Sequence, residues 1–309
     1  MDPAMSLFGL GANDSHFRLR GGLTRSMDRI LRRTGWKDMI RFVVPRTARN
    51  WLRSPSKSAM WVWDGAKFSL GITQSLQMAP NLGLVCHPHA YKVYRASQIL
   101  DSEQSAEFRN FLPHCSTSMT LFDVGAHFGI FSLAAARFGG RAVAIDPSHT
   151  ATRMIEIQAS LNGLSSAIEI VCAAVDDSAG SLDMVSSGVF SDGYFQGARG
   201  RSSRELTRVR AVTIDQLSQR YGAPTHIKID VEGNEAAVLR GAKDVLSEHR
   251  PILFIELHNE MMIAEGRDPE APLAALARHG YSTYTVRGAM IEKSAILHHP
   301  LIRIVASYP

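Results

Sequence analysis

The 309-residue sequence predicts an α/β fold, with a doubly wound, mostly parallel sheet in its second half. From residue 119 onward, short apolar runs alternate with helical runs and glycine turns, as they do in consecutive β-α-β units. The predicted strands are short and apolar, which fits a sheet that helices cover on both faces. Hydrophobic residues make up 45% of the chain and charged residues 20%, which is typical of a globular protein.

The first 58 residues form a basic arm. They hold twelve of the 34 lysines and arginines and four of the 29 acids, so the rest of the chain has a surplus of acids. Leu23, Met27, Ile30 and Leu31 repeat at helical spacing and predict an amphipathic helix with arginines on its other face. We expect this arm to pack on the acidic body. Peripheral contact with an anionic membrane surface and a targeting role are the alternatives.

Residues 59–118 predict a hairpin and a helix that lead into the α/β domain. Met60–Trp63 and Lys67–Leu70 flank Asp64–Ala66, whose glycine suits a hairpin turn. After an irregular stretch, Asp101–Leu112 predicts a helix that ends before a proline.

The remaining residues, 119–309, form the α/β domain. In sheets of this kind, ligands bind beyond the carboxyl ends of the strands, at the point where the strand order reverses. We therefore expect the functional site among the loops that follow the strands. The predicted elements are strand Thr120–Val124, helix Ile130–Arg137, strand Ala142–Ile145, helix Ala151–Leu161, strand Ile168–Val175, strand Ile227–Val231, helix Glu235–Leu246, strand Ile252–Leu257 and helix Pro272–Arg278.

Cysteine content and hydropathy bear on the cellular compartment. Cys86, Cys115 and Cys172 are widely spaced and fit neither a disulfide framework nor a zinc site, so we expect a reducing, cytoplasmic setting. No apolar run approaches the ~18 residues that a membrane span needs. The first residues also lack the apolar stretch of a secretory signal.

The loop that follows the first strand of the domain predicts a cofactor site. Gly125 lets the backbone turn tightly beside a ligand, and Gly129 lets the next helix pack close to the sheet. The turn offers backbone N–H groups to an anion, and Asp123 could accept a hydrogen bond from an ammonium group. Asp146 ends the next strand, where a carboxylate can bind ribose hydroxyls. The Gly-x-Gly-x-x-Gly pattern of dinucleotide sites is absent, so these residues favour S-adenosylmethionine over NAD.

Charged side chains gather at the ends of the two later strands. Lys228, Asp230 and Glu232 alternate along the first of them, and Glu256 and His258 lie at the end of the second. Such a cluster suits a general base, a substrate clamp or a hard-cation site. We take Asp230, Glu256, His258 and Lys228 as candidate catalytic residues, and Asp230 and Glu256 also as candidate ligands of one Mg²⁺ ion. A structural ion pair for Lys228 and a structural hydrogen bond for His258 stay open.

Six segments together have a more specific pattern, namely Phe122–Gly129, Ala144–Pro147, Thr213–Asp215, Ile227–Glu235, Val238–Ala242 and Ile255–Glu256. They resemble the FkbM family of Rossmann-like methyltransferases over roughly residues 119–283. The most specific part is Lys-Ile-Asp-Val-Glu-Gly followed by Leu-x-Gly-Ala. His127 stands where such loops commonly have asparagine. The resemblance implies that Ala174 lies near the adenine and that the cofactor is bound by Asp123, Gly125, Ala126, His127, Gly129 and Asp146.

The resemblance implies an S-adenosylmethionine-dependent transferase that O-methylates a hydroxyl of a sugar, glycan or natural product. A non-catalytic cofactor-binding protein and methylation of a nitrogen or of a nucleic acid are the alternatives. Nucleic acid is disfavoured, because Asp230–Gly233 does not have the Asn/Asp-Pro-Pro-aromatic pattern of enzymes that methylate a flipped base. The serine-, glycine- and arginine-rich stretch Asp183–Arg208 predicts a long loop beside the pocket. The acceptor and the oligomeric state are left open by the sequence.

Overall fold

The computed structural model describes residues 55–100, 102–186, 195–197, 206–289 and 299–309. The amphipathic helix predicted in the basic arm lies outside these ranges. The chain divides into two compact units, Met1–Gln74 with His87–His89, and Ser75–Cys86 with Ala90–Pro309. Among the described helices, none has both the length and the apolar character that crossing a bilayer requires.

In the first unit, the described residues include helix α3 (Pro55–Ser69). The hairpin predicted over Met60–Leu70 is therefore wrong. Asp64, which was expected in the turn, is a fully buried helix residue whose Oδ2 lies 3.2 Å from Nδ1 of His89. The Trp61 ring stacks on the His89 ring with 4.0 Å between their centroids. These tertiary contacts outweigh the local turn preference of the Asp-Gly pair.

A hairpin does occur within residues 59–118, but further along the chain. Strands β1 (Gln74–Ala79) and β2 (Leu82–Cys86) form a two-stranded sheet in the stretch that was expected to be irregular. Polar residues in β1 and a glycine in β2 weaken the apolar signal of these strands. Helix α4 (Pro88–Leu100), which was not predicted, comes next, and α5 (Ser102–Phe111) matches the predicted helix.

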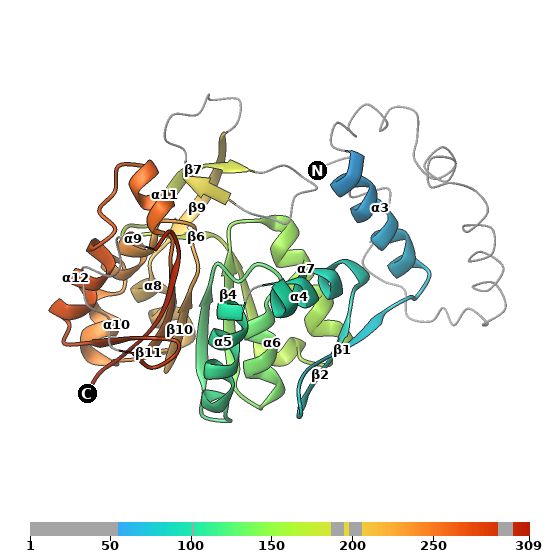
Figure 1. Ribbon diagram of the computed structural model, residues 1–309, viewed down its shortest axis with the longest axis horizontal. Helices are drawn as coiled ribbons and strands as arrows, with labels where there is room; N and C mark the ends of the chain where they lie inside the picture. The colour runs from blue at the N-terminus through green and yellow to red at the C-terminus, as the bar shows by residue number, and fades with distance from the viewer. Residues whose placement is uncertain (1–54, 101, 187–194, 198–205, 290–298) are drawn as a thin grey trace. The chain divides into compact units, whose positions relative to one another are not determined.

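The predicted doubly wound sheet is confirmed (Figure 1). Within the described residues, seven strands form it in the order β12 (Ser282–Thr285), β13 (Ile302–Ser307), β11 (Ile252–Leu257), β10 (His226–Ile229), β3 (Thr120–Val124), β4 (Arg141–Asp146) and β5 (Ile168–Cys172). Strands β11, β10, β3, β4 and β5 are parallel, and β13 runs antiparallel to both of its neighbours. The chain goes outward from β3 through β4 to β5 and later returns to β10 on the other side of β3. The strand order therefore reverses between β3 and β10, where such sheets bind ligands.

Helices connect the strands and pack on the sheet. Helix α6 (Ile130–Arg137) packs on β3 and β4, and α7 (His149–Leu161) packs on β4 and β5. The helix predicted over Glu235–Leu246 is divided at Gly241, where a Cβ would lie 2.2 Å from the carbonyl oxygen of Asp176. The other described helices of this unit are α8 (Ile214–Tyr221), α9 (Glu235–Arg240), α10 (Lys243–Glu248), α11 (Asn259–Ala264) and α12 (Ala271–Arg278).

A long loop was predicted over Asp183–Arg208, but both ends of this stretch belong to strands of a second sheet. In the described residues its order is β6 (Ala174–Val175), β9 (Leu206–Val212), β7 (Gly180–Ser186) and β8 (Phe195–Gly197). In β9, Val209 and Ala211 are buried whereas Arg208 and Arg210 are exposed. Because one face of this strand is exposed to solvent, its composition is as polar as that of a loop. Residues 187–194 and 198–205 of the predicted loop lie outside the described ranges.

The backbones that follow β3 and β10 touch at the carboxyl edge of the central sheet. The N–H of Asp230 donates a hydrogen bond to Val124 O at 2.9 Å. Gly125 has a φ of 76°, and a Cβ at this position would lie 1.7 Å from Asp230 O. Both the backbone conformation and the available space therefore require glycine.

We expect Gly125→Ala to destabilise the protein far more than Gly163→Ala does. Gly163 has a similar φ of 69°, but no atom lies within 4 Å of its hypothetical Cβ. Both variants carry the cost of positive φ, about 1 kcal/mol, and Gly125→Ala should lose at least about 2 kcal/mol more through the clash. Urea unfolding measures the difference. Equal losses would show that the loop moves away from β10 at little cost.

Candidate active site

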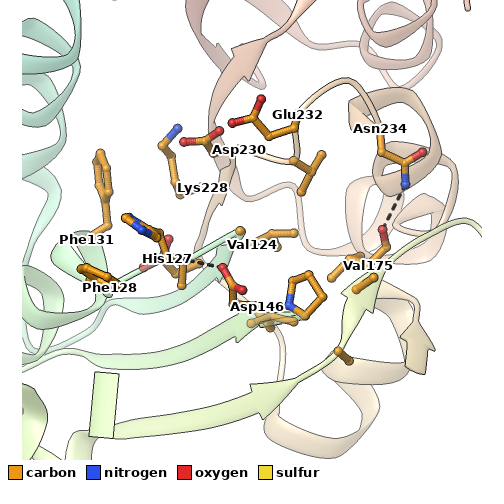
Figure 2. A pocket seen from close by; sticks show the side chains of 18 of the residues that line it. Val124, His127, Phe128, Phe131, Asp146, Val175, Lys228, Asp230, Glu232 and Asn234 are labelled. Atoms are coloured by element: carbon orange, nitrogen blue, oxygen red, sulfur yellow. Dashed lines mark hydrogen bonds between the residues drawn. The ribbon is translucent and has the colours of Figure 1, made fainter. Parts of the chain in front are cut away.

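A pocket lies at the carboxyl ends of β3, β4 and β10, where the strand order reverses (Figure 2). Its walls come from the loop after β3, the end of β4, strand β6 and the residues after β10. The sequence predicted a site in this region. The lining is completed by Tyr94 and Gln104 from α4 and α5 and by Leu182 and Met184 from β7.

The loop after β3 is held in a tight, partly left-handed conformation. The N–H groups of Gly125 and Ala126 both donate to Ile145 O, at 2.9 and 3.0 Å. His127 and Gly129 have φ values of 49° and 77°. Positive φ is uncommon for a residue other than glycine, and such strain is frequent at functional sites. Gly129 immediately precedes α6, so the loop ends at a helix N-terminus.

Asp146 is buried at the end of β4 and ties this loop to the sheet. Its Oδ2 accepts a hydrogen bond from the N–H of His127 at 2.9 Å, and its Oδ1 accepts one from the N–H of Ser148 at 2.8 Å. Burial raises the pKa of Asp146 to about 7, although these hydrogen bonds act in the opposite direction. Each carboxylate oxygen has a further lone pair and can still accept a hydrogen bond from a ligand hydroxyl.

Asp123 also lines the pocket and is buried. Its Oδ2 accepts hydrogen bonds from both the N–H and the hydroxyl of Ser132, at 3.0 and 2.6 Å. Burial raises the pKa of Asp123 to about 6, and the bonds from Ser132 limit the rise. One oxygen of Asp123 therefore joins β3 to α6, and Oδ1 is the atom with capacity for a ligand.

The wall formed by β6 and β7 is mainly apolar. Ala174 and Val175 of β6 line the pocket together with Leu182 and Met184 of β7. The side-chain amide of Asn234, which follows β10, donates a hydrogen bond to Val175 O in this wall at 3.3 Å (Figure 2). An apolar wall of this kind suits an aromatic ring, and Ala174, which was expected near the adenine, is part of this wall.

His258, which follows β11, stands among three acids. Its Nδ1 lies 2.8 Å from Oε1 of the fully buried Glu235, which also accepts a hydrogen bond from the N–H of Gly233 at 3.0 Å. Its Nε2 faces Asp230 Oδ1 and Glu232 Oε2, each at 3.7 Å. Burial alone would lower the pKa of His258, but the Glu235 bond and the three acidic charges raise it to about 9. Glu235 thus fixes the orientation of the imidazole.

Glu232 adds a strained residue to the pocket. It has a φ of 54° and lines the pocket next to Asp230. Burial raises the pKa of Glu232 to about 7, and the charge of His258 opposes this rise. Figure 2 shows the carboxylates of Asp230 and Glu232 side by side, with the Lys228 amine next to Asp230. The carboxylates of Asp230 and Glu232 and the imidazole of His258 therefore lie together at the carboxyl end of β10.

Lys228 and Glu256 belong to a buried ring of alternating charges. Lys228 Nζ lies 3.1 Å from Glu107 Oε1 and 3.8 Å from Glu256 Oε2. Arg303 closes the ring, with Nη2 2.5 Å from Glu256 Oε1 and Nε 3.8 Å from Glu107 Oε2. Burial would lower the pKa of Lys228, but the surrounding carboxylates raise it. Lys228 therefore stays protonated, in the ion pair that the sequence had left open.

The predicted candidates thus separate into two groups. Asp230 lines the pocket and His258 lies 3.7 Å from it, whereas Lys228, which also lines the pocket, is engaged with Glu256 in the buried ring. Sequence analysis did not identify Glu107 and Arg303. Arg303 had a detectable signal, because a charge within the apolar strand β13 requires a buried partner, and it pairs across strands with Glu256.

The geometry fits a Mg²⁺ ion poorly. Asp230, Glu256 and His258 offer ligand atoms that all lie within 4.8 Å of one another. However, Glu256 is held by Arg303 and Lys228, whose positive charges would repel a cation. A cation would also have to displace the proton that His258 binds up to a pKa of about 9.

Many of the residues that line the pocket lie within the range that a family model matches. A family model described as "Methyltransferase FkbM domain" matches residues 123–283. This range contains the glycine loop, Asp146, Asp230 and His258. No match is found among curated proteins.

Several solved structures are similar to the chain at low identity. A methyltransferase FkbM from Methylobacillus flagellatus is 18% identical with a TM-score of 0.42, and the match covers 62% of this chain and 44% of that one. The chain thus spans less than half of that protein. An O-methyltransferase from Bacillus cereus in complex with SAH is 14% identical (TM-score 0.39; 72% and 89% covered). A ribosomal protein L11 methylase from Lactobacillus delbrueckii is 13% identical (TM-score 0.41; 76% and 98% covered).

We expect no saturable Mg²⁺ binding at this cluster, because Lys228 and Arg303 already neutralise Glu256. Calorimetric titration of the EDTA-treated protein with MgCl₂ measures it, with Asp230→Asn as the matched variant. Saturable binding in the micromolar range that Asp230→Asn abolishes would contradict the expectation and restore the metal site.

Proposed function

The chain belongs to the FkbM methyltransferase family, whose domain spans residues 123–283. From this premise, we propose that it transfers a methyl group from S-adenosylmethionine to a hydroxyl of a sugar, glycan or other natural product. The observation that favours a hydroxyl acceptor is the imidazole of His258, which Glu235 orients beside the pocket. A hydroxyl must lose a proton when it is methylated, and a held imidazole can accept that proton.

The pocket residues fit the cofactor. The loop after Gly125 ends at the N-terminus of α6, which suits a carboxylate, and the absence of a Cβ at Gly125 lets this loop lie against the residues after β10. We assign the amino group of the cofactor to Asp123 and its ribose hydroxyls to Asp146. We assign its adenine to the apolar wall that contains Ala174. The assigned loop residues are Gly125, Ala126, His127 and Gly129.

When bound, S-adenosylmethionine supplies an electrophilic methyl group attached to a sulfonium. The residues of the chain then have to orient the acceptor and remove its proton. In our proposal, Nε2 of His258 would take the proton of the acceptor hydroxyl, while the methyl carbon would exchange its bond to sulfur for one to the hydroxyl oxygen and S-adenosylhomocysteine would leave. The Asp230 carboxylate, 3.7 Å from Nε2, would stabilise the protonated imidazole. Glu235 stabilises the resulting imidazolium through its hydrogen bond to Nδ1. Positioning of the acceptor in line with the methyl group supplies much of the acceleration.

Lys228 and Glu256 have a different role in this proposal. Lys228 stays protonated and therefore cannot act as a general base. Glu256 Oε1 lies 2.5 Å from Arg303 Nη2, and Glu256 also lies beside Lys228. It therefore positions the ammonium group of Lys228 and does not take the proton of the acceptor hydroxyl. We propose that the ring keeps the lysine ammonium fixed next to Asp230. We also propose that the reaction needs no Mg²⁺.

We expect Asp146→Ala to weaken S-adenosylhomocysteine binding by about tenfold or more, because hydrogen bonds to the ribose are lost. Asp244→Ala, on the exposed surface of α10, is the control and should bind normally. Wild-type affinity should also fall as the pH drops below about 7, since Asp146 then gains a proton and loses an acceptor. Isothermal calorimetry measures both effects. Unchanged affinity in folded Asp146→Ala would remove this residue from the site, and preferential binding of NAD would contradict the proposed cofactor.

We expect the imidazole of His258 to titrate at a pH well above 6.5, near the value of about 9 given by its surroundings. In Glu235→Gln the neutral amide should lower that pKa, because a charged acceptor no longer stabilises the imidazolium. Methylation should rise with pH as His258 loses its proton, and this rise should move to lower pH in Glu235→Gln. NMR of ¹³C-labelled histidine measures the pKa, with the exposed Glu248→Gln as the control.

The same titration can contradict this account. A pKa near 6.5 in both the wild type and Glu235→Gln would show that Glu235 does not orient His258. His258→Ala should lower the rate by about 100-fold or more if the imidazole is the base. A folded His258→Ala variant with near-normal activity would assign the proton to another group.

A further inference from the structure

A second cavity lies beside the cofactor pocket. The two cavities have four wall residues in common, namely Tyr94, Gln104, Ile130 and Phe131. The rest of its wall comes from strand β1 and helix α5, so we call it the α5 cavity. Its own wall residues are Gln77, Met78, Ser105, Phe108 and Arg109.

The shared wall is held in place from both sides. The hydroxyl of Tyr94, which is buried, donates a hydrogen bond to Phe128 O in the glycine loop at 2.5 Å. The ring of Phe131 meets that of Phe108 edge to face, with 5.4 Å between centroids. Lys228 Nζ lies 5.4 Å from the centroid of the same Phe131 ring (Figure 2). Phe131 therefore adjoins the α5 cavity through Phe108 and the cofactor pocket through Lys228.

Helix α5 presents one face to the α5 cavity and another to the sheet. Gln104, Ser105, Phe108 and Arg109 are spaced as neighbours on one helical face. Glu107 lies on the adjacent face and is fully buried, with its Oε1 3.1 Å from Lys228 Nζ. Because Lys228 belongs to β10, this ion pair fixes α5 relative to the strand that ends at the proposed catalytic residues.

The chemistry of the α5 cavity suits a polyhydroxylated ring. Tyr94, Phe108 and Phe131 provide aromatic surface, which can cover the apolar C–H face of a sugar. The amide of Gln104 and the guanidinium of Arg109 provide planar groups that bond to hydroxyls. Such a combination of aromatic surface with a few polar groups is typical of sites for small polar ligands.

The two cavities also differ in their origin along the chain. The residues assigned to the cofactor all lie within 123–283, the range of the family domain. The residues that belong only to the α5 cavity lie between Gln77 and Arg109, before that range. We propose that the α5 cavity binds a glycosyl ring of the methyl acceptor, so that acceptor specificity comes from β1 and α5. This inference rests on the proposed methyl transfer.

The test measures glycoside binding and cofactor binding separately. Saturation-transfer NMR is recorded with methyl glycosides of common hexoses, deoxyhexoses and uronic acids, in the presence of S-adenosylhomocysteine. Arg109→Ala removes a polar group, and Ser105→Tyr fills the cavity. Arg137→Ala is the matched control, because Arg137 is an exposed arginine in the last turn of α6, as Arg109 is in α5. Calorimetry gives the affinity of every variant for S-adenosylhomocysteine.

We expect at least one glycoside to bind the wild type and the Arg137→Ala variant. Arg109→Ala, through one lost hydrogen bond, and Ser105→Tyr, through steric exclusion, should each weaken that binding by about fivefold or more, while S-adenosylhomocysteine affinity stays unchanged. Undiminished glycoside binding in both variants would overturn the assignment of the α5 cavity. If S-adenosylhomocysteine binds and no glycoside does, the glycosyl class is wrong although the cofactor proposal stands. Failure of the wild type to bind S-adenosylhomocysteine would instead overturn the proposed function.

Discussion

The backbone that follows β10 occupies the space into which a side chain at Gly125 would project. A Cβ there would lie 1.7 Å from Asp230 O, and the Asp230 N–H donates to Val124 O at 2.9 Å. This contact joins the glycine loop, which His127 links to Asp146, to the segment that bears the acidic cluster. The groups proposed to bind the cofactor and those proposed to act on the acceptor therefore share one rigid base. Small movements of either strand would change both.

Charge is arranged in two layers around β10. In the buried layer, Lys228 and Arg303 alternate with Glu107 and Glu256, so each charge has opposite neighbours. Removal of one member would leave a buried charge without compensation, which is far more costly than exchange of a complete pair for apolar residues. This ring also joins α5 to strands β10, β11 and β13 of the central sheet.

The layer next to the pocket has a surplus of acids. Asp230, Glu232 and Glu235 surround the single imidazole of His258. In our proposal, this negative surplus suits a positively charged sulfonium, and the raised pKa of His258 follows from the same field. The strained φ of Glu232, 54°, keeps its carboxylate in this layer.

The sequence was sufficient to predict the parallel sheet and most of the pocket, because these depend on local patterns. Apolar runs that alternate with helices predicted β3, α6, β4 and β11 closely, and the glycine turn with Asp146 predicted the pocket. The hairpin over Met60–Leu70 was wrong because buried tertiary contacts of Asp64 and Trp61 decide that segment. Strands β7 and β9 were missed because one face of each is solvated, so that their composition resembles a loop.

The ring of buried charges could not be predicted from one sequence. Glu107 and Arg303 meet Lys228 and Glu256 only through the fold, since 196 positions separate the first pair along the chain. The role of Glu235 was hidden for a related reason. An acid at the start of a helix is ordinary, and only the 2.8 Å contact with His258 Nδ1 distinguishes it.

The central claim is that one rigid edge of the sheet holds the cofactor beside the His258 imidazole. A crystal structure of the protein with S-adenosylhomocysteine tests this most directly. The account predicts ribose hydroxyls on the carboxylate of Asp146, adenine against Ala174 and the sulfur at the end of β10 near Asp230. Density for the ligand away from the glycine loop, or a sulfur on the far side of the pocket from Asp230 and His258, would contradict it.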